Sequence, residues 1–207
     1  MYMKKNMSPT KIKYLTVGFA CVVLITVALI WMITAVYVQR DDRTVVRRLA
    51  WYFPIASVGA QTINYGQFMQ ARDAIRVFLN SQVVKDAGRS QPLTPQIEQS
   101  AYDRLLREAV TRELAKQHNV TVSDEDVRAA YTAFLVQASS SVSNVAQYLA
   151  DTFHWTEEQY RFMVIRPQLL EEKVVATFPT STDQYTQFEG YVASRLAKPD
   201  VKKYLKF

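Results

Sequence analysis

Residue types that commonly carry catalysis or bind metals are few in this chain, and they are scattered along it. The 207 residues include a single cysteine, Cys21, and two histidines, His118 and His154. One cysteine forms neither an intramolecular disulfide nor a four-cysteine zinc site, and neither histidine has a second ligand at metal-binding spacing. We interpret Cys21 as a small apolar residue and both histidines as structural, one ending a helix and one preceding a helix start. No metal site is predicted.

Two polar clusters have the composition of a reactive site, but each has a simpler explanation. The serines at 139–141 lack the strand–turn–helix context of a nucleophile, so we interpret them as a connecting segment. The acids at 124–126 could attract a cation, yet acids in the first turn of a helix are already favoured by the helix dipole. The sequence contains no phosphate-binding loop, dinucleotide-binding glycine pattern or HExxH zinc motif. We expect no catalytic and no cofactor-binding residue, and we do not expect an enzyme.

An uncharged stretch near the start of the chain has the length of a membrane span. Between Lys13 and Arg40 there is no Asp, Glu, Lys, Arg or His. As a helix, residues 14–38 would span roughly 37 Å, which exceeds the ~30 Å hydrocarbon core of a bilayer. A cleaved signal peptide has an apolar core of only about 7–15 residues, followed by a small-x-small cleavage site that is missing here. The pattern predicts an uncleaved transmembrane signal anchor over residues 14–39, after a cytoplasmic tail of residues 1–13. Basic residues flank both ends equally, so charge alone leaves the orientation open.

Beyond the anchor, the sequence predicts a mainly α-helical domain with a small β-hairpin at its start. Residues 40–54 form a charged juxtamembrane linker that ends in the helix-breaking Pro54, and Gly59 supplies a turn between short strands at 55–58 and 61–63. Apolar residues then recur at three- and four-residue intervals, which is the period of an amphipathic helix. The expected helices cover residues 65–79, 95–118, 124–135, 145–150, 157–175 and 185–196.

Several residues mark where these helices begin, end or bend. Thr94 provides an N-cap ahead of a proline, and Ser123 and Thr156 each begin a capping box. Asn119 ends the second helix, because asparagine tolerates the left-handed backbone that follows a helix. Pro167 lies inside the fifth helical pattern, where it lacks a backbone donor and crowds the carbonyl group four residues earlier. We expect a kink there.

The order of these elements resembles the SurA N-terminal-like family. The resemblance is carried by the hairpin and helix start at 58–68, by the long helix, brief connector and acidic helix start at 102–127, and by the capping box at 154–161. It covers roughly residues 55–178 and implies a helical chaperone domain. Members normally carry a parvulin-type peptidyl-prolyl isomerase domain, and the residues after Phe178 are too few for one. We expect residues 179–207 to form an amphipathic helix and a basic tail.

The resemblance also implies a function and a location. It implies a membrane-anchored, ATP-independent chaperone (a holdase) that binds unfolded or newly translocated polypeptides and needs no cofactor. It further implies an extracytoplasmic, periplasmic C-terminal domain, so that the chain is a single-pass protein of a bacterial cytoplasmic membrane with its N-terminus inside. Two alternatives stay open: an assembly or scaffold subunit that binds one specific membrane protein complex, and the front portion of a longer peptidyl-prolyl isomerase.

Aromatic side chains in the helical region are the candidates for client binding under this resemblance. Most aromatic residues of a domain form its core, but a chaperone exposes a minority in a groove whose apolar walls accept extended segments of many sequences. A methionine adds an adaptable contact. The predicted client-binding residues are Phe68, Phe78, Tyr131, Phe134, Tyr148, Phe153, Trp155, Phe162 and Met163.

The positive charge of the chain lies mainly outside this domain. Lysines and arginines number 25 against 19 acids, a net charge of +6. Four of the basic residues are lysines within residues 1–13, where there is no acid, which leaves 21 basic and 19 acidic residues from Arg40 onward. The nearly neutral domain has no nucleic-acid recognition motif and no localised basic patch. No nucleic-acid partner is expected.

Overall fold

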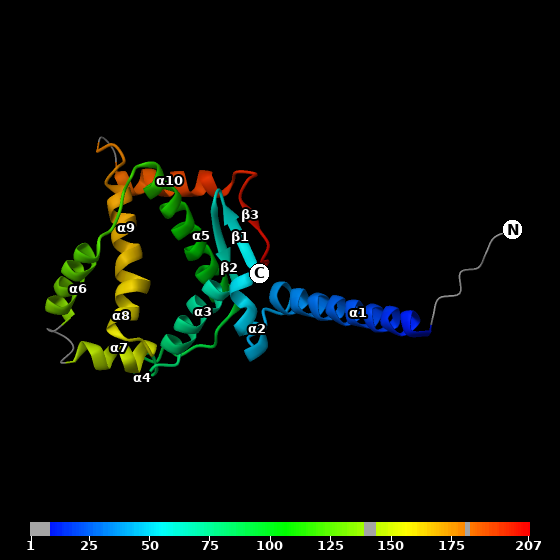
Figure 1. The fold of residues 1–207 in the computed structure, drawn as a ribbon. Coiled ribbons are helices and arrows are strands. Elements are labelled where there is room, and N and C mark those ends of the chain that lie inside the picture. The colour runs from blue at the N-terminus through cyan, green and yellow to red at the C-terminus, as the bar shows by residue number, and fades with distance from the viewer. Residues whose placement is uncertain (1–8, 139–143, 181–182) are drawn as a thin grey trace.

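The computed structural model describes residues 9–138, 144–180 and 183–207, with side chains from Cys21 onward. One long helix, α1 (Pro9–Tyr37), projects from a helical domain (Figure 1). The other helices are α2 (Thr44–Leu49), α3 (Tyr65–Leu79), α4 (Gln82–Asp86), α5 (Pro95–Gln117), α6 (Asp124–Ala138), α7 (Val145–Phe153), α8 (Glu157–Tyr160), α9 (Arg166–Val175) and α10 (Gln184–Leu196). A 3-10 turn (Ala50–Tyr52) follows α2, and a π-helical turn (Arg161–Ile165) joins α8 to α9. The prediction of a mainly α-helical fold with a small hairpin at the start of the domain is confirmed.

The hairpin belongs to a three-stranded antiparallel sheet. Strands β1 (Pro54–Val58) and β2 (Gln61–Asn64) pair directly, and Gly59 takes φ +53° in the turn between them, as predicted. The third strand, β3 (Lys202–Lys203), comes from the C-terminal tail and pairs with the other edge of β1. The backbone N–H of Tyr204 adds a bond of 2.9 Å to the carbonyl oxygen of Ile55. The basic tail therefore completes the sheet, which the sequence pattern did not predict.

The centre of the domain is the long helix α5. The hairpin, α3, α9 and α10 all pack against it (Figure 1). The side chains that meet there are apolar and fully or nearly fully buried, so the burial of apolar surface holds these elements together. This core includes Ile55, Ile63, Phe68, Leu106, Val110, Val174 and Phe188.

The C-terminal end of α1 is part of the same core. Met32, Ala35 and Val36 are buried in one cluster with Val46 of α2. The hydroxyl group of Tyr37 donates a hydrogen bond of 2.7 Å to the carbonyl oxygen of Pro54. These contacts fix the direction in which α1 leaves the domain.

The predicted transmembrane span, residues 14–39, lies almost wholly within α1. The side chains of residues 14–20 are outside the described part of the chain. Among the residues that the structure describes, no helix has both the length and the apolar character needed to cross a membrane. The span stays a prediction.

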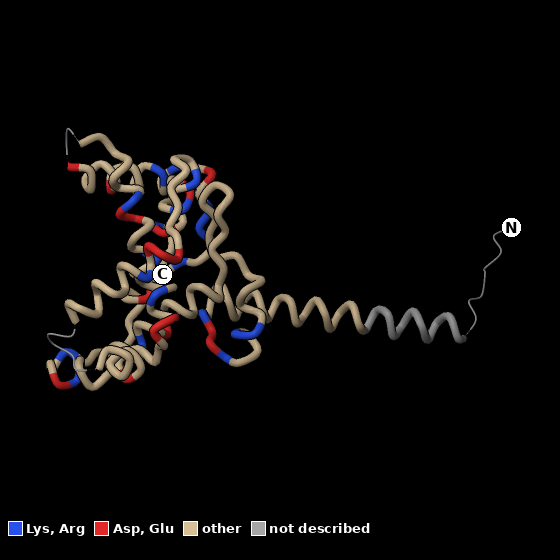
Figure 2. The backbone as a smooth tube through the Cα atoms, turned by 60° about the vertical axis from the view of Figure 1, so that its left-hand side comes forward, with Lys and Arg blue, Asp and Glu red and all other residues tan. Residues whose placement is uncertain are grey.

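Residues 40–47, expected to belong to a charged linker, are tied to α3 by ion pairs. Asp42 lies 3.5 Å from the guanidinium of Arg72, and Arg47 pairs with Asp73 at 2.5 Å. Arg72 is nearly fully buried and donates a further bond of 2.9 Å to the carbonyl oxygen of Arg40. Basic and acidic residues are interleaved in this way over the domain, and residues 21–37 of α1 carry none (Figure 2).

The C-terminal segment also joins the core. Phe188 and Val192 of α10 are buried against the helices below them. The guanidinium of Arg195 pairs with the carboxylate of Glu113 in α5 through Nε at 2.7 Å and through a second nitrogen at 2.9 Å. The same guanidinium holds Asp200 at 2.9 Å, just ahead of β3. This ion pair links α5, α10 and the C-terminal strand.

The predicted start and stop signals are found where local chemistry places them. Thr94 accepts a bond from the backbone N–H of Ile97, and Thr156 forms a capping box with Gln159. Asn119 follows α5 with φ +55°. One short helix, α4, lies between the predicted helices at 65–79 and 95–118, where no helix was expected.

Candidate functional site

Phe68 lies apart from the other predicted client-binding residues. Its side chain is fully buried, and its ring packs against Tyr65 at 5.9 Å and Tyr102 at 6.5 Å between ring centroids. Both neighbours belong to the main core. Phe68 therefore contributes to the packing of α3 on α5 and presents no surface to a client.

Four predicted residues form one aromatic cluster between the end of α3 and α7. Phe78 stacks on Phe153 with ring centroids 5.6 Å apart, and Phe153 stacks on Trp155 at 5.3 Å. Tyr148 meets the edge of Phe153 at 6.3 Å. His154 brings Phe153 and Trp155 together, because its left-handed backbone (φ +56°) ends α7 and reverses the chain. Phe78 remains 38% exposed, so the cluster reaches the surface.

Two more predicted residues, Tyr131 and Phe134, hold α6 against the rest of the domain. Their rings contact each other at 6.0 Å, and the ring of Phe134 lies 5.0 Å from that of Tyr160. Tyr131 is buried with Val127 and Ile165 in a small core that is separate from the main one. Phe134 lines a cavity of about 290 Å³ between α6 and α9.

Phe162 and Met163 line the larger cavity, which we call the Phe162 hollow. It has a volume of about 560 Å³ and lies among α3, α6 and the π-helical turn. Phe162 is 66% exposed, so its ring is available to a bound molecule. The other lining residues are Gln70, Asp124, Val127, Arg128, Glu158, Gln159, Arg161 and Arg166.

Pro167 accounts for the geometry of this hollow. Because proline has no backbone N–H, the carbonyl oxygen of Met163 loses its normal partner four residues later. The chain widens into a π-helical turn, in which the backbone N–H of Arg166 bonds to the carbonyl oxygen of Arg161. The free Met163 oxygen instead accepts a bond of 3.2 Å from the side chain of Arg104 in α5. The predicted kink is therefore a π-helical turn that presents Phe162 and Met163 to the hollow.

Charged groups form the rim of the hollow and fasten α6 to α9. Arg166 pairs with Asp124 and also donates a bond of 3.0 Å to the carbonyl oxygen of Val122. Outside the hollow, Lys173 of α9 lies 2.7 Å from Asp126 of α6, and this hydrogen bond lowers the pKa of Asp126 to about 2. The rim carries both signs of charge. Its walls therefore do not select strongly for an acidic or a basic ligand.

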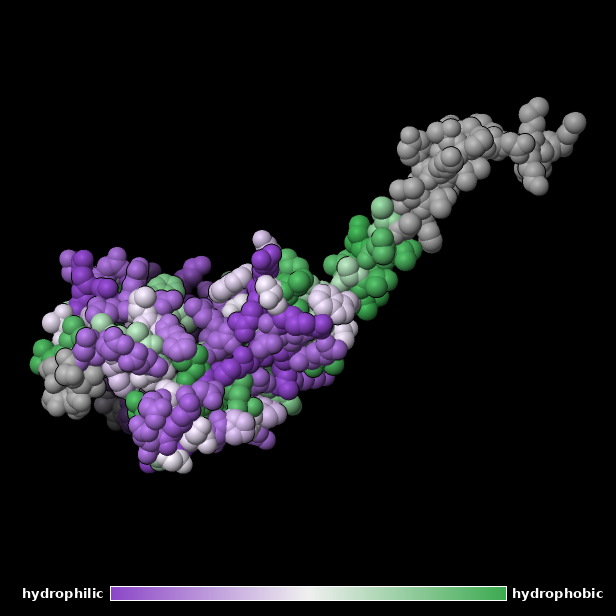
Figure 3. Space-filling model, turned by 90° about the horizontal axis from the view of Figure 1, so that it is seen from below, coloured by the Kyte–Doolittle hydropathy of each residue, from purple (hydrophilic) through white to green (hydrophobic). Residues whose placement is uncertain are grey.

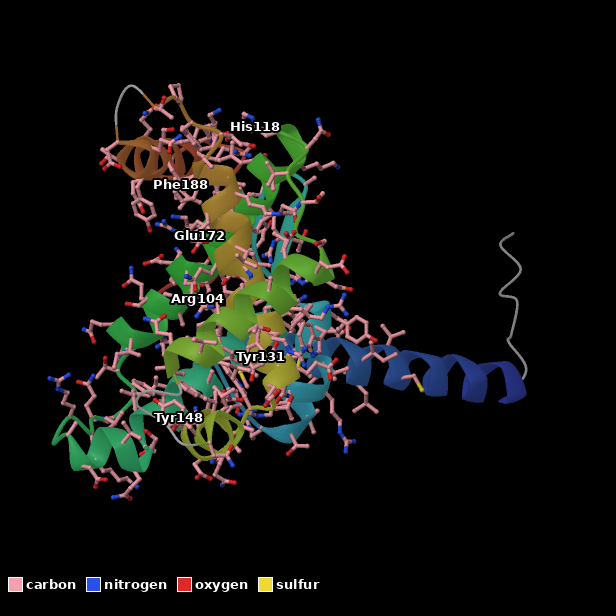
Figure 4. The ribbon with its side chains drawn as sticks, turned by 90° about the vertical axis from the view of Figure 1, so that its left-hand side faces the viewer. Arg104, His118, Tyr131, Tyr148, Glu172 and Phe188 are labelled. Carbon is pink, nitrogen blue, oxygen red and sulfur yellow. The ribbon has the colours of Figure 1, made fainter. Side chains whose placement is uncertain are left out.

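The aromatic cluster and the Phe162 hollow lie on the same part of the domain. Gln70 and Phe78 are eight residues apart on α3, which corresponds to about 12 Å along a helix. Tyr131 and Tyr148 are both in the lower half of Figure 4, at the opposite end from His118 and Phe188. Eight of the nine predicted residues are therefore brought together around α6, α7 and the π-helical turn.

Sequence reasoning missed the polar residues that shape this region. Gln70, Arg128 and Arg161 line the hollow, and Arg104 supports it from α5. The sequence signals that pointed to this place were Pro167 and the predicted client-binding residues Phe162 and Met163. Within the described ranges, no three His, Cys, Asp or Glu side chains come together in a group that could hold a metal ion.

The domain is helical, with a small sheet near α1 and exposed aromatic rings at the far end. These are features of a module that binds polypeptides through apolar contacts. The chain matches the family model of the SurA-like N-terminal domain over residues 3–175 and belongs to that family. The resemblance inferred from the sequence is thereby confirmed. Membership indicates a chaperone-type function and is consistent with the binding of unfolded polypeptides. No curated protein and no solved structure matches the chain.

Proposed function

We propose that this protein is a membrane-anchored, ATP-independent holdase that binds unfolded polypeptides on the outer face of a bacterial cytoplasmic membrane. The observation that carries the proposal is the exposed Phe162 ring beside a hollow with a mixed-charge rim. The aromatic cluster that ends in Phe78 extends the apolar surface along α3. A client segment with alternating apolar and polar side chains finds a partner for each kind on this surface.

The strength of binding follows from the size of the exposed rings. Burial of a phenylalanine side chain contributes about 1.5–3 kcal/mol. Two or three such contacts, reduced by the cost of ordering both partners, give a weak affinity. A weak complex releases its client spontaneously, which is what a holdase without a nucleotide requires.

The anchor in this proposal rests on the uncharged sequence of residues 14–38 and on the exposed apolar side chains of α1. Val22, Leu24, Ile25, Val27 and Ile30 are all exposed in the described part of that helix. A hydrocarbon environment suits such a surface. Tethering raises the effective concentration of the domain near emerging chains, so that a weak affinity is sufficient. We place the domain outside the cytoplasm, with the N-terminus inside, because the resemblance to SurA-like chaperones implies that arrangement.

The test uses the full chain in lipid nanodiscs and a chemically denatured client whose aggregation is followed by light scattering. Phe162→Ser is expected to raise the concentration needed for half suppression about tenfold, since it removes one apolar contact of about 1.4 kcal/mol or more. Val136→Ser is the matched control, because Val136 is an exposed apolar residue that does not line the hollow. Equal activity of the two variants, or no suppression by the unmodified chain at several-fold excess, would contradict the proposal.

Capture from solubilised membranes separates this function from the assembly alternative. A holdase retains many clients in less than one-to-one amounts, and Phe162→Ser reduces all of them together. Recovery of one partner at one-to-one stoichiometry, unaffected by Phe162→Ser, would point to an assembly subunit.

A further inference from the structure

A second exposed apolar surface lies beside the point where α1 leaves the domain, and none of its residues lines the Phe162 hollow. It consists of Val45 and Leu49 of α2 with Trp51 and Tyr52 of the following 3-10 turn, and we call it the α2 patch. Trp51 and Tyr52 are 55% and 80% exposed. Hydrophobic residues are visible at the base of α1 in Figure 3. None of these four side chains belongs to the predicted client-binding set.

The α2 patch is held in a fixed shape. A Cβ atom on Gly66 would lie 2.5 Å from Cδ2 of Trp51, so the indole ring lies directly on the backbone of α3 and leaves no room for a side chain there. Its other face is open. Val46 is fully buried against the end of α1 and directs the opposite face of α2 outward. Exposed aromatic rings that are held in defined positions are typical of a surface that binds another molecule or a membrane.

The contacts of α1 show at which height along the axis of α1 this patch lies. The guanidinium carbon of Arg43, just before α2, lies 5.2 Å from the ring centroid of Trp31. Figure 1 shows α2 next to the domain end of α1, which is Tyr37. A ~30 Å hydrocarbon core that begins at Tyr14 ends about 20 residues later, near Thr34. The α2 patch is therefore level with the lipid headgroups.

We propose that the α2 patch inserts into the headgroup region of the leaflet from which α1 emerges and so fixes the orientation of the domain on the membrane. This inference rests on the anchor in the proposed function. Tryptophan and tyrosine rings are favoured at the membrane–water interface. Arg48 is exposed and makes no ion pair with any residue that the structure describes, which leaves it available to anionic headgroups. Two attachments, α1 and the patch, prevent rotation of the domain about α1. The helices α6 and α7, with the client-binding surface, are then held away from the bilayer (Figure 1).

The inference is tested with an environment-sensitive NBD label on the full chain. Because Cys21 is the only cysteine, Cys21→Ser with Tyr52→Cys carries one label on the patch. Cys21→Ser with Val136→Cys carries the control label on α6. In vesicles that contain phosphatidylglycerol, the label at 52 is expected to emit at shorter wavelength than the label at 136 and to be quenched by headgroup-labelled nitroxide lipid. Equal emission and equal quenching at the two sites would overturn the inference.

A variant of the patch provides the second arm. Leu49→Ser with Trp51→Ser is expected to abolish the blue shift of the label at 52, whereas Val83→Ser, at an exposed apolar site on α4, leaves it unchanged. Melting curves of each variant show whether the domain remains folded. Chain that stays in the membrane fraction with a water-exposed label at 52 overturns this inference and leaves the anchor intact. Chain that leaves the membrane fraction overturns both. Shielding of the label only after a denatured client is added would identify the patch as a client surface and also overturn the inference.

Discussion

The ion pair between Arg195 and Glu113 gives a prediction about what the C-terminal segment does for stability. The side chain of Arg195 is 6% exposed and that of Glu113 is 18% exposed, so both charges are largely removed from water. Replacing Arg195 with methionine keeps the apolar stem but leaves the Glu113 carboxylate buried without its partner. Breaking a buried pair in this way costs about 3–5 kcal/mol. Because Glu113 retains some contact with water, we expect the lower value, about 3 kcal/mol.

The full chain in detergent micelles provides the assay, with urea unfolding followed by circular dichroism. A loss of about 3 kcal/mol corresponds to a fall in Tm of roughly 6–12 °C for a domain of this size. The double variant Glu113→Gln with Arg195→Met is expected to recover most of this loss, since it leaves no buried charge behind. Arg128→Met is the control, because its ion pair with Glu125 is exposed on both sides and is expected to contribute less than about 1 kcal/mol.

Two results would refute the reasoning. If Arg195→Met cost no more than Arg128→Met, the C-terminal segment would not be fastened to α5 by this pair. If the double variant were as unstable as Arg195→Met alone, the cost would come from the lost bonds of the guanidinium to Asp200 rather than from the unpaired Glu113 carboxylate.

Three further predictions concern other contacts. Lys173 lowers the pKa of Asp126 to about 2, so the contribution of this pair to stability is present above about pH 4 and is lost as the pH falls toward 2. The difference in Tm between the unmodified chain and Asp126→Asn should therefore vanish over that interval. A constant difference would contradict this prediction. Burial raises the pKa of Tyr65 to about 12, so the contribution of its protonated hydroxyl to stability is complete below pH 10 and is lost as the pH rises to 12. Tyr65→Phe should cost about 1 kcal/mol at neutral pH, because it removes the hydrogen bond to the carbonyl oxygen of Asp41. Between pH 10 and 12, urea unfolding should show a smaller loss of stability for this variant than for the unmodified chain. Pro167→Ala restores a backbone donor and should straighten the π-helical turn without lowering Tm. Suppression of client aggregation should weaken, because Phe162 turns away from the hollow. Unchanged suppression would show that the turn does not position this ring.

Features that depend on neighbouring residues in the chain were predictable. The N-cap at Thr94 and the capping box at Thr156 form because a side-chain oxygen meets backbone donors two or three residues away. The turn at Gly59 and the helix end at Asn119 follow from residues that tolerate a left-handed backbone. By contrast, β3 consists of two lysines that pair with a strand near the other end of the domain. No local pattern distinguishes such a strand from a solvated basic tail.

The candidate site shows the same division. Helical periodicity places Phe68 and Phe78 on α3, but the two residues meet different surroundings: Phe68 faces α5, and Phe78 faces α7. Which of them is buried depends on where the other helices pack, and that information lies in contacts distant in sequence. The hollow itself depends on Arg104, which reaches a carbonyl group 59 residues later. Pro167 predicts that this carbonyl is free but not which side chain will bind it.

The Phe162 hollow, the α2 patch and the junction of α1 with the domain have complementary roles in the proposed function. A weak client site is useful only if it is kept where clients emerge, and a flexible tether would let the site turn toward the bilayer as often as away from it. In this chain Ala35 and Val36 are buried in the core of the domain, so that α1 and the domain move together. A rigid junction on its own fixes the tilt of the domain but permits rotation about α1. The α2 patch lies to one side of the α1 axis. It therefore adds a second point of attachment, which blocks rotation of the domain about α1. The label at residue 52 therefore tests whether the client-binding surface has a defined direction as well as a defined location.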